Sequence, residues 1–159
     1  MSDIAVAHST TPFITTYPWS SGFGTKYTDP GTLPVGTAFS VAFSPDGNDI
    51  AVAHESTPFI TTYPWSSGFG TKYTNPGTLP AGTGNGISFS PDGNNIAVAH
   101  NNSPNITAYP WSSGFGTKYT NPGTLPASSA IGVAFLPLPV SGFTPNPLMH
   151  MRMMAGGAM

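Results

Sequence analysis

The chain has 159 residues, of which 38% are hydrophobic and only 6% are charged, and it contains 19 glycines, 18 prolines and no cysteine. Abundant glycine and proline with few charged side chains disfavour helices and favour short strands joined by turns, and the missing cysteines exclude disulfides. The net charge of −2 offers no basic surface for nucleic acid, so an all-β domain without a nucleic-acid partner is expected.

The N-terminus passes directly from Met1 into a strand-like run at residues 4–8. No basic stretch followed by an apolar one precedes this run, so no signal peptide is expected. No stretch approaches the roughly 20 apolar residues that a membrane helix needs. The sequence therefore predicts a soluble protein without a membrane span.

A repeat of 46 residues organises the chain. The run Ile-Ala-Val-Ala-His occupies residues 4–8, 50–54 and 96–100, always at this offset. A longer run that begins Tyr-Pro-Trp-Ser-Ser-Gly is unchanged between residues 17–28, 63–74 and 109–120. The three units are therefore expected to share one structure, and this period is a stronger guide to the fold than the preference of any short segment.

One unit contains four candidate strands, at residues 41–43, 50–54, 59–63 and 71–74. The first two flank Ser-Pro-Asp-Gly, in which Pro45 presets the first turn position and Gly47 accepts a positive φ, so they form a hairpin. Four strands in a period of about 40–50 residues are typical of a β-propeller blade. The sequence thus predicts three four-stranded blades within residues 1–135.

The turns at residues 43–47 and 89–93, each leading into Ile-Ala-Val-Ala-His, resemble those of WD-repeat-like β-propellers over residues 3–135. The fuller unit, with Tyr-Pro-Trp-Ser and Asn-Pro-Gly-Thr-Leu-Pro, is similar to repeats of bacteriophage virion and tail-associated proteins. The Trp-Asp and Gly-His pairs of true WD repeats are absent. The resemblance implies a structural protein located in a virion; for a protein that no phage encodes, a cytoplasmic location is expected.

The first blade is split between the two ends of the chain. Residues 3–8 supply its second strand, whereas its first strand appears only at residues 131–135. Propellers typically have 4–8 blades, so three blades cannot close a ring. We therefore expect Ile131, Val133 and Phe135 to join another copy, most simply in a homodimer of six blades with C2 symmetry, or in a higher oligomer.

Residues 136–159 form a separate C-terminal arm that is first rich in proline and then in methionine. Methionine adapts to irregular surfaces, so the arm is interpreted as a docking peptide. The cluster of Met149, His150 and Met151 also offers soft donors for Cu(I), but soft residues alone do not define a site, and docking is favoured.

Two sets of repeated side chains are candidates for binding. His8, His54 and His100 could converge on a metal, but packing is favoured, and no metal or cofactor is predicted. The other set pairs a tyrosine with a tryptophan beside a turn in each unit: Tyr17 and Trp19, Tyr63 and Trp65, Tyr109 and Trp111. These pairs would either stack on sugar rings or fill the space between blades, and packing is favoured there too.

The inventory for catalysis is poor, because Glu55 is the sole glutamate and Asp46 and Asp92 belong to turns. The protein is therefore not expected to be an enzyme. The favoured hypothesis is a structural or assembly module, phage-related by its resemblance, that binds itself and other virion or cell-surface proteins. The alternative is a lectin-like propeller with one carbohydrate site per repeat.

Overall fold

The computed structural model of the chain describes residues 2–137, and this part folds entirely as β-structure. It has no helix, and hence none that could span a membrane. The expectation of an all-β fold is confirmed. The strands are β1 (Ser2–Ala7), β2 (Ile14–Trp19), β3 (Ala38–Phe43), β4 (Asp49–His54), β5 (Ile60–Pro64), β6 (Gly84–Phe89), β7 (Asn95–His100) and β8 (Ile106–Pro110).

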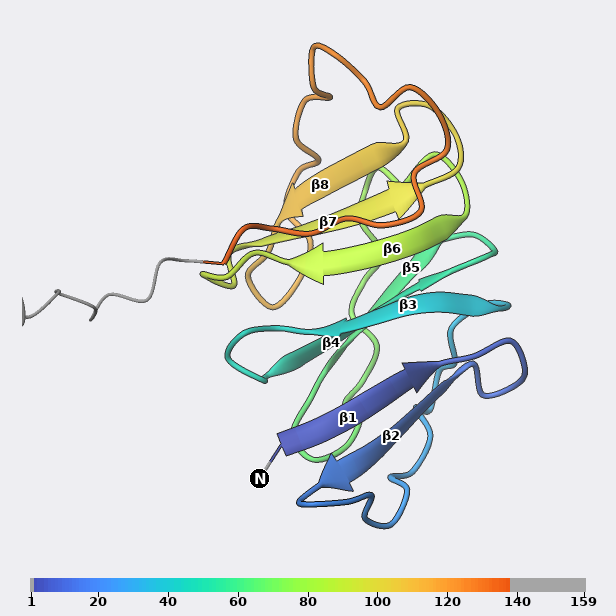
Figure 1. Cartoon of the computed structure of the whole chain (residues 1–159), viewed down its shortest axis with the longest axis vertical. Helices are drawn as coiled ribbons and strands as arrows, with labels where there is room; N and C mark the ends of the chain where they lie inside the picture. Colours follow the sequence, from blue (N-terminus) through green and yellow to red (C-terminus); the bar gives the residue numbers. More distant parts are fainter. Residues whose placement is uncertain (1, 138–159) are drawn as a thin grey trace, which may run out of the picture.

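The strands form three antiparallel sheets that follow the repeat. The first sheet holds β1 and β2, the second β3, β4 and β5, and the third β6, β7 and β8. Figure 1 shows them in a row along the molecule, with the first and third sheets at opposite ends. The register is also repeated: Val41 lies opposite Val52, and Ile87 lies opposite Val98.

The turns between the first two strands of the second and third sheets have the expected chemistry. The amide of Gly47 donates to the carbonyl of Ser44 at 2.9 Å, and Gly47 adopts a φ of 74°. The Asp46 carboxylate accepts hydrogen bonds from the Ser44 hydroxyl and the Asn48 amide. These bonds lower the pKa of Asp46, which therefore stays ionised in the turn. The predicted hairpin is confirmed.

The predicted fourth strand is wrong. Residues 71–74 and their counterparts form no ladder, so the complete sheets have three strands. A single backbone bond, from the Tyr73 amide to the Thr62 carbonyl at 2.9 Å, joins this segment to β5. The Tyr73 carbonyl accepts a hydrogen bond from Lys72 Nζ at 3.2 Å. Pro64 ends β5 and has no N–H to donate, so beyond it the two segments meet only through the bond from the Gly70 amide to the Pro64 carbonyl and an isolated bridge between Trp65 and Phe69, and no continuous ladder forms.

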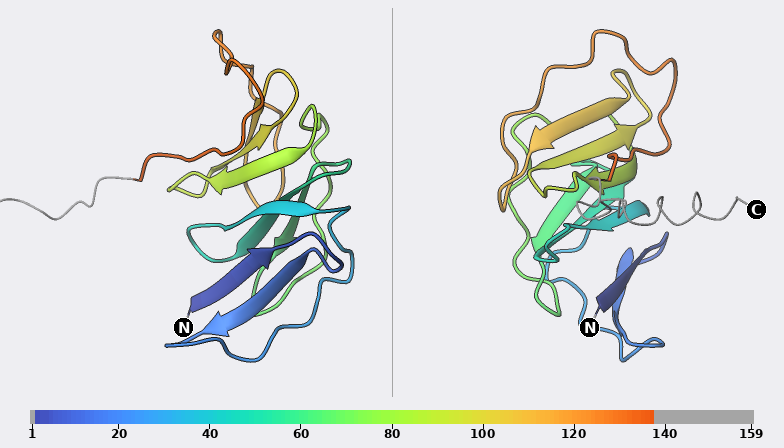
Figure 2. Two further views of the ribbon diagram at one scale, coloured as in Figure 1. Left: turned by 45° about the vertical axis from the view of Figure 1, so that its right-hand side comes forward. Right: turned by 60° about the vertical axis from the view of Figure 1, so that its left-hand side comes forward.

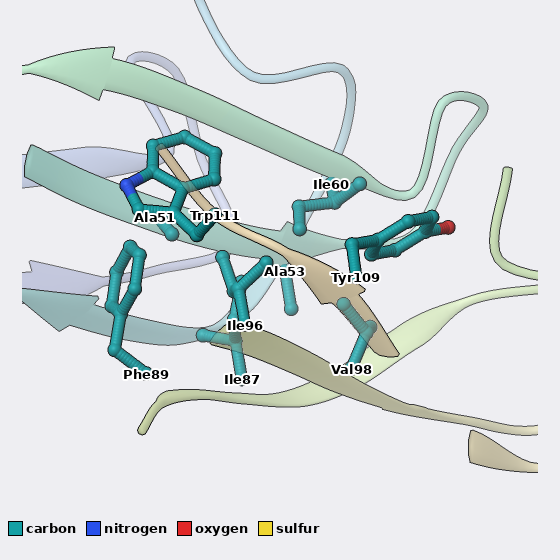
Figure 3. Close-up of a cluster of buried hydrophobic side chains, with 9 residues drawn as sticks. All are labelled: Ala51, Ala53, Ile60, Ile87, Phe89, Ile96, Val98, Tyr109 and Trp111. Carbon is teal, nitrogen blue, oxygen red and sulfur yellow. The ribbon is translucent and has the colours of Figure 1, made fainter. Parts of the chain in front are cut away.

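The core lies between neighbouring sheets, in two clusters. One joins the first and second sheets and contains Ile14, Ala38, Ile50, Val52, Tyr63 and Trp65. The other joins the second and third sheets and is drawn in Figure 3: Ala51, Ala53, Ile60, Ile87, Phe89, Ile96, Val98, Tyr109 and Trp111. Because the central strand β4 contributes to both clusters, every one of its residues is buried.

Candidate interaction surfaces

A cluster around Trp65 fastens the second sheet to the first. The Trp65 indole nitrogen donates to Asp3 Oδ2 at 2.9 Å, and the other carboxylate oxygen of Asp3 accepts the Tyr27 hydroxyl at 2.9 Å. The rings of Tyr27, Phe43 and Phe69 pack edge to face on the indole, with centroids 5.1–5.4 Å away. Trp65 is only 5% exposed, so this tryptophan cluster is an internal contact.

The same cluster recurs between the second and third sheets. Trp111 donates to Asp49 Oδ2 at 2.9 Å, and the Tyr73 hydroxyl donates to Asp49 Oδ1 at 2.8 Å. Phe89 and Phe115 pack on this indole as Phe43 and Phe69 pack on Trp65. The tryptophan cluster is therefore the repeated device that joins one sheet to the next.

Trp19, the first member of the set, lacks most of this cluster. It is 39% exposed, and its one aromatic neighbour in the described chain is Phe23, itself 64% exposed. Tyr17 differs from its counterparts too. The hydroxyls of Tyr63 and Tyr109 donate to the carbonyls of Thr32 and Thr78 at 2.7 Å, whereas that of Tyr17 makes no hydrogen bond within residues 2–137. The first sheet thus ends in an open aromatic surface, the Trp19 surface.

The other end of the row carries the complementary half of a tryptophan cluster. Tyr119 is 48% exposed, and its hydroxyl donates to Asn95 Oδ1 at 2.8 Å, as Tyr27 and Tyr73 donate to Asp3 and Asp49. No indole within the described part of the chain occupies this place. The third sheet therefore ends in a half-cluster formed by Asn95 and Tyr119.

Residues 130–135, the closing segment, run beside β6 (Figures 1 and 2). The Ala130 amide donates to the His100 carbonyl at 3.1 Å, matching the bond from Ala38 to His8 at 3.2 Å. A Cβ on Gly86 would lie 2.8 Å from Gly132 Cα, so glycine permits this close approach. The structure assigns no strand to this segment, and Ile131 is 82% exposed. Its predicted pairing with another copy stays a prediction.

His54 and His100 end β4 and β7, and His8 directly follows β1, so each belongs to a different repeat; each ring hydrogen-bonds to a threonine of the neighbouring strand. Nε2 of His8, His54 and His100 lies 2.9 Å from the hydroxyl of Thr15, Thr61 and Thr107 respectively. Burial lowers the pKa of His54 to about 4 and also lowers that of His100. Residues 2–137 contain no group of His, Asp or Glu arranged to hold a metal ion. These contacts favour the packing interpretation.

Two cavities lie where the hairpin turns meet the next sheet. One, of about 440 Å³, is lined by Asp46, Asp49, Asp92 and Trp111, among others. The other, of about 370 Å³, lies beside Asp3 and Trp65. Each tryptophan there is bonded to the adjacent carboxylate, so the cavities flank the tryptophan clusters.

The sugar-stacking interpretation requires open ring faces. Trp65 and Trp111 are each 5% exposed, and Tyr63 and Tyr109 are fully buried. Their burial speaks against sugar sites in the second and third repeats, so one equivalent site per repeat is not supported. Only the Trp19 surface leaves an indole of this set open in the described structure.

The sequence interpretation overlooked the acceptors of the tryptophan clusters, Asp3, Asp49 and Asn95, and their tyrosines. The sequence does contain a signal for these acceptors, because the equivalent positions 3 and 49 are aspartate whereas position 95 is asparagine. No protein-family model and no curated protein sequence matches the chain.

Proposed function

We propose that this protein is a non-enzymatic assembly module whose sheets are blades of a β-propeller, and that copies of the chain join to complete the ring. The observation that carries this proposal is that the tryptophan cluster is complete between neighbouring sheets but incomplete at both ends of the row. Tryptophan clusters join the first to the second sheet and the second to the third, while the Trp19 surface and the half-cluster of Asn95 and Tyr119 remain at opposite ends. An incomplete contact of the same kind at each end suits head-to-tail association, which can close into a ring.

The charged inventory supports a role without catalysis. Asp46 and Asp92 are engaged by the serine and asparagine of their own turns, and these hydrogen bonds lower both pKa values. A carboxylate held ionised in this way is a poor proton donor near neutral pH. The further proposal that the module belongs to a bacteriophage virion or tail rests on the resemblance of its repeats.

Sedimentation velocity over a range of protein concentrations tests the assembly proposal. We expect species whose masses are whole multiples of the chain mass of 16.4 kDa, with the dimer as the smallest closed form. Negative-stain images should then show a ring of six blades. A folded species that remains monomeric at all concentrations would contradict the proposal.

A carbohydrate-binding function is the second candidate, and the exposure of Trp19 is the observation that favours it. Aromatic rings beside a turn can stack on the apolar face of a sugar. In this case a glycan array should show binding, and Trp19→Ala should abolish it. Lys26→Ala, a change at another exposed site of the same repeat, should leave the binding intact. Absence of binding on the array would contradict the carbohydrate-binding function and leave assembly as the remaining candidate.

A further inference from the structure

We propose that the closing segment of one copy, the donor, adds to the free edge of β1 in a second copy, the acceptor, and that Trp19 of the acceptor completes the donor's half-cluster of Asn95 and Tyr119. This inference rests on the proposed assembly function and specifies its interface. It names the residues that meet and the register in which they meet.

The free edge of β1 is the first part of the evidence. β4 and β7 have nearly the same sequence as β1, and each is paired on both sides, whereas within residues 2–137 β1 is paired with β2 alone. Val6 is 43% exposed, but its counterparts Val52 and Val98 are fully buried. An apolar strand with one unpaired edge is a template for another strand.

The closing segment already holds the position of a first strand. It lies against β6 as β6 lies against β3, because the Ile87 amide reaches Ser40 Oγ at 3.2 Å and the equivalent Val133 amide lies 3.2 Å from the Cβ site of Gly86. Its sequence equals that of β3 in four places: Ala130 for Ala38, Val133 for Val41, Ala134 for Ala42 and Phe135 for Phe43. The segment is thus placed as the first strand of a sheet whose remaining strands belong to another copy.

The repeat predicts the register between the two copies. β3 pairs with β4 so that Val41 faces Val52 and Phe43 faces Ile50. Val133 stands two repeat periods after Val41, and Val6 stands one period before Val52, so the equivalent pairing puts Val133 of the donor opposite Val6 of the acceptor. The same equivalence puts Phe135 of the donor opposite Ile4 of the acceptor.

The side chains then complete the contacts that the acceptor lacks. In the internal cluster, Phe43 lies 5.4 Å and Tyr27 lies 5.3 Å from the Trp65 ring. The donor's Phe135 and Tyr119 would take these two places on Trp19. The donor's Thr124 carbonyl would accept the Tyr17 hydroxyl, as the Thr32 carbonyl accepts that of Tyr63 at 2.7 Å.

Asn95 makes this contact chemically different from the internal ones. Asp49 accepts the Tyr73 hydroxyl with one oxygen and the Trp111 indole with the other, but a carboxamide has only one oxygen. If the Asn95 carboxamide rotates, its oxygen can accept the Trp19 indole N–H while its NH2 group donates to the Tyr119 hydroxyl. The bond to the indole is then neutral rather than charge-assisted, and weaker. The contact between copies is therefore weaker than the contacts within a copy.

Cysteine cross-linking of the full chain tests the register, since the natural sequence has no cysteine. The bond from the Ser44 amide to the Asp49 carbonyl marks a hydrogen-bonded pair, so Val41 and Val52 form a non-hydrogen-bonded pair, whose side chains are closer. A chain with Val6→Cys is mixed with a chain carrying Val133→Cys. We expect a disulfide between the two chains after mild oxidation, identified by mass spectrometry. A chain with both Val41→Cys and Val52→Cys is the internal positive control.

The outcomes separate this inference from the proposed function. Association without the cross-link, or equally efficient cross-linking of Val6→Cys to the off-register Ala134→Cys, overturns the strand register and leaves the assembly function in place. Monomers at all concentrations overturn both.

Asn95→Asp tests the contact with Trp19 through a substitution that should strengthen the association between copies rather than weaken it. The second repeat carries aspartate at this position in the same turn, so the variant should fold. We expect it to tighten association by about tenfold, because the Trp19 indole gains a charged acceptor. Trp19→Phe, which removes the indole donor and keeps an aromatic ring, should cancel this gain. An unchanged or weakened association of Asn95→Asp would overturn the contact.

Discussion

Two tryptophans of identical local sequence have different surroundings, which allows a matched test at the level of residues. Truncating a buried aromatic side chain costs about 3–5 kcal/mol. We expect a loss of this size for Trp65→Ala, because Trp65 is 5% exposed, and a much smaller loss for Trp19→Ala, which is 39% exposed in a single copy. Urea unfolding at a concentration where copies are dissociated measures both. Equal losses would contradict the role of Trp65 as an internal contact.

His54 predicts how stability depends on pH. Its pKa is lowered to about 4 by burial, whereas the unfolded chain binds the proton near pH 6.5. The unfolded state thus binds more protons between these values, so the free energy of unfolding falls as the pH drops from 7 to 4, by roughly 3 kcal/mol at most. The lowered pKa of His100 acts in the same direction.

Urea unfolding between pH 7 and pH 4 measures this dependence, and His54→Gln, which retains a hydrogen-bonding group near Thr61, should flatten it. Asp46 and Asp92, whose pKa values are lowered, also begin to lose their contribution to stability as the pH approaches 4, but His54→Gln leaves that part unchanged, so the difference between the two proteins isolates the histidine. A wild-type protein whose stability is constant from pH 7 to pH 4 would contradict the buried neutral histidine.

At the level of elements, the close approach of β6 and the closing segment predicts a local effect at Gly86. A Cβ there would lie 2.8 Å from Gly132 Cα and 2.9 Å from the Ile131 carbonyl oxygen, and backbone atoms cannot give way cheaply. We expect Gly86→Ala to displace the closing segment, which raises hydrogen exchange in residues 130–135 and weakens association. Gly77→Ala is the control, because its Cβ would meet nothing within 4 Å. Unchanged exchange in Gly86→Ala would show that the segment does not rest on β6.

In the three-stranded sheets, the hairpin turns could be predicted from the sequence, but the absence of a fourth strand could not. The hairpin turns were predictable because Pro45 and Gly47 restrict the backbone locally. The fourth strand was not, since Thr-Lys-Tyr-Thr has the composition of a strand. Its lysine instead bonds to the next carbonyl in the chain, and the proline that ends β5 limits pairing.

At the level of the whole molecule, truncation tests whether the closing segment is required for assembly. A chain that ends at Ala130 loses the predicted strand and the Phe135 ring, so we expect it to remain monomeric in sedimentation experiments. A chain that ends at Pro137 keeps the segment and should still associate. Assembly by both truncated chains to the same extent would show that copies join elsewhere.

The sequence by itself determined the all-β class, the period of the sheets and their hairpin turns, because these depend on local backbone preferences and on a repeat that is visible in one dimension. Only the tertiary structure decided which copies of a repeated side chain are buried. Trp65 and Trp19 have the same neighbours in sequence. Of the two, only Trp65 has a neighbouring sheet that packs on its ring and supplies its hydrogen-bond acceptor, Asp3. Burial depends on what lies across from a residue in space, and for the first and third sheets that partner is not supplied by residues 2–137 of the same chain.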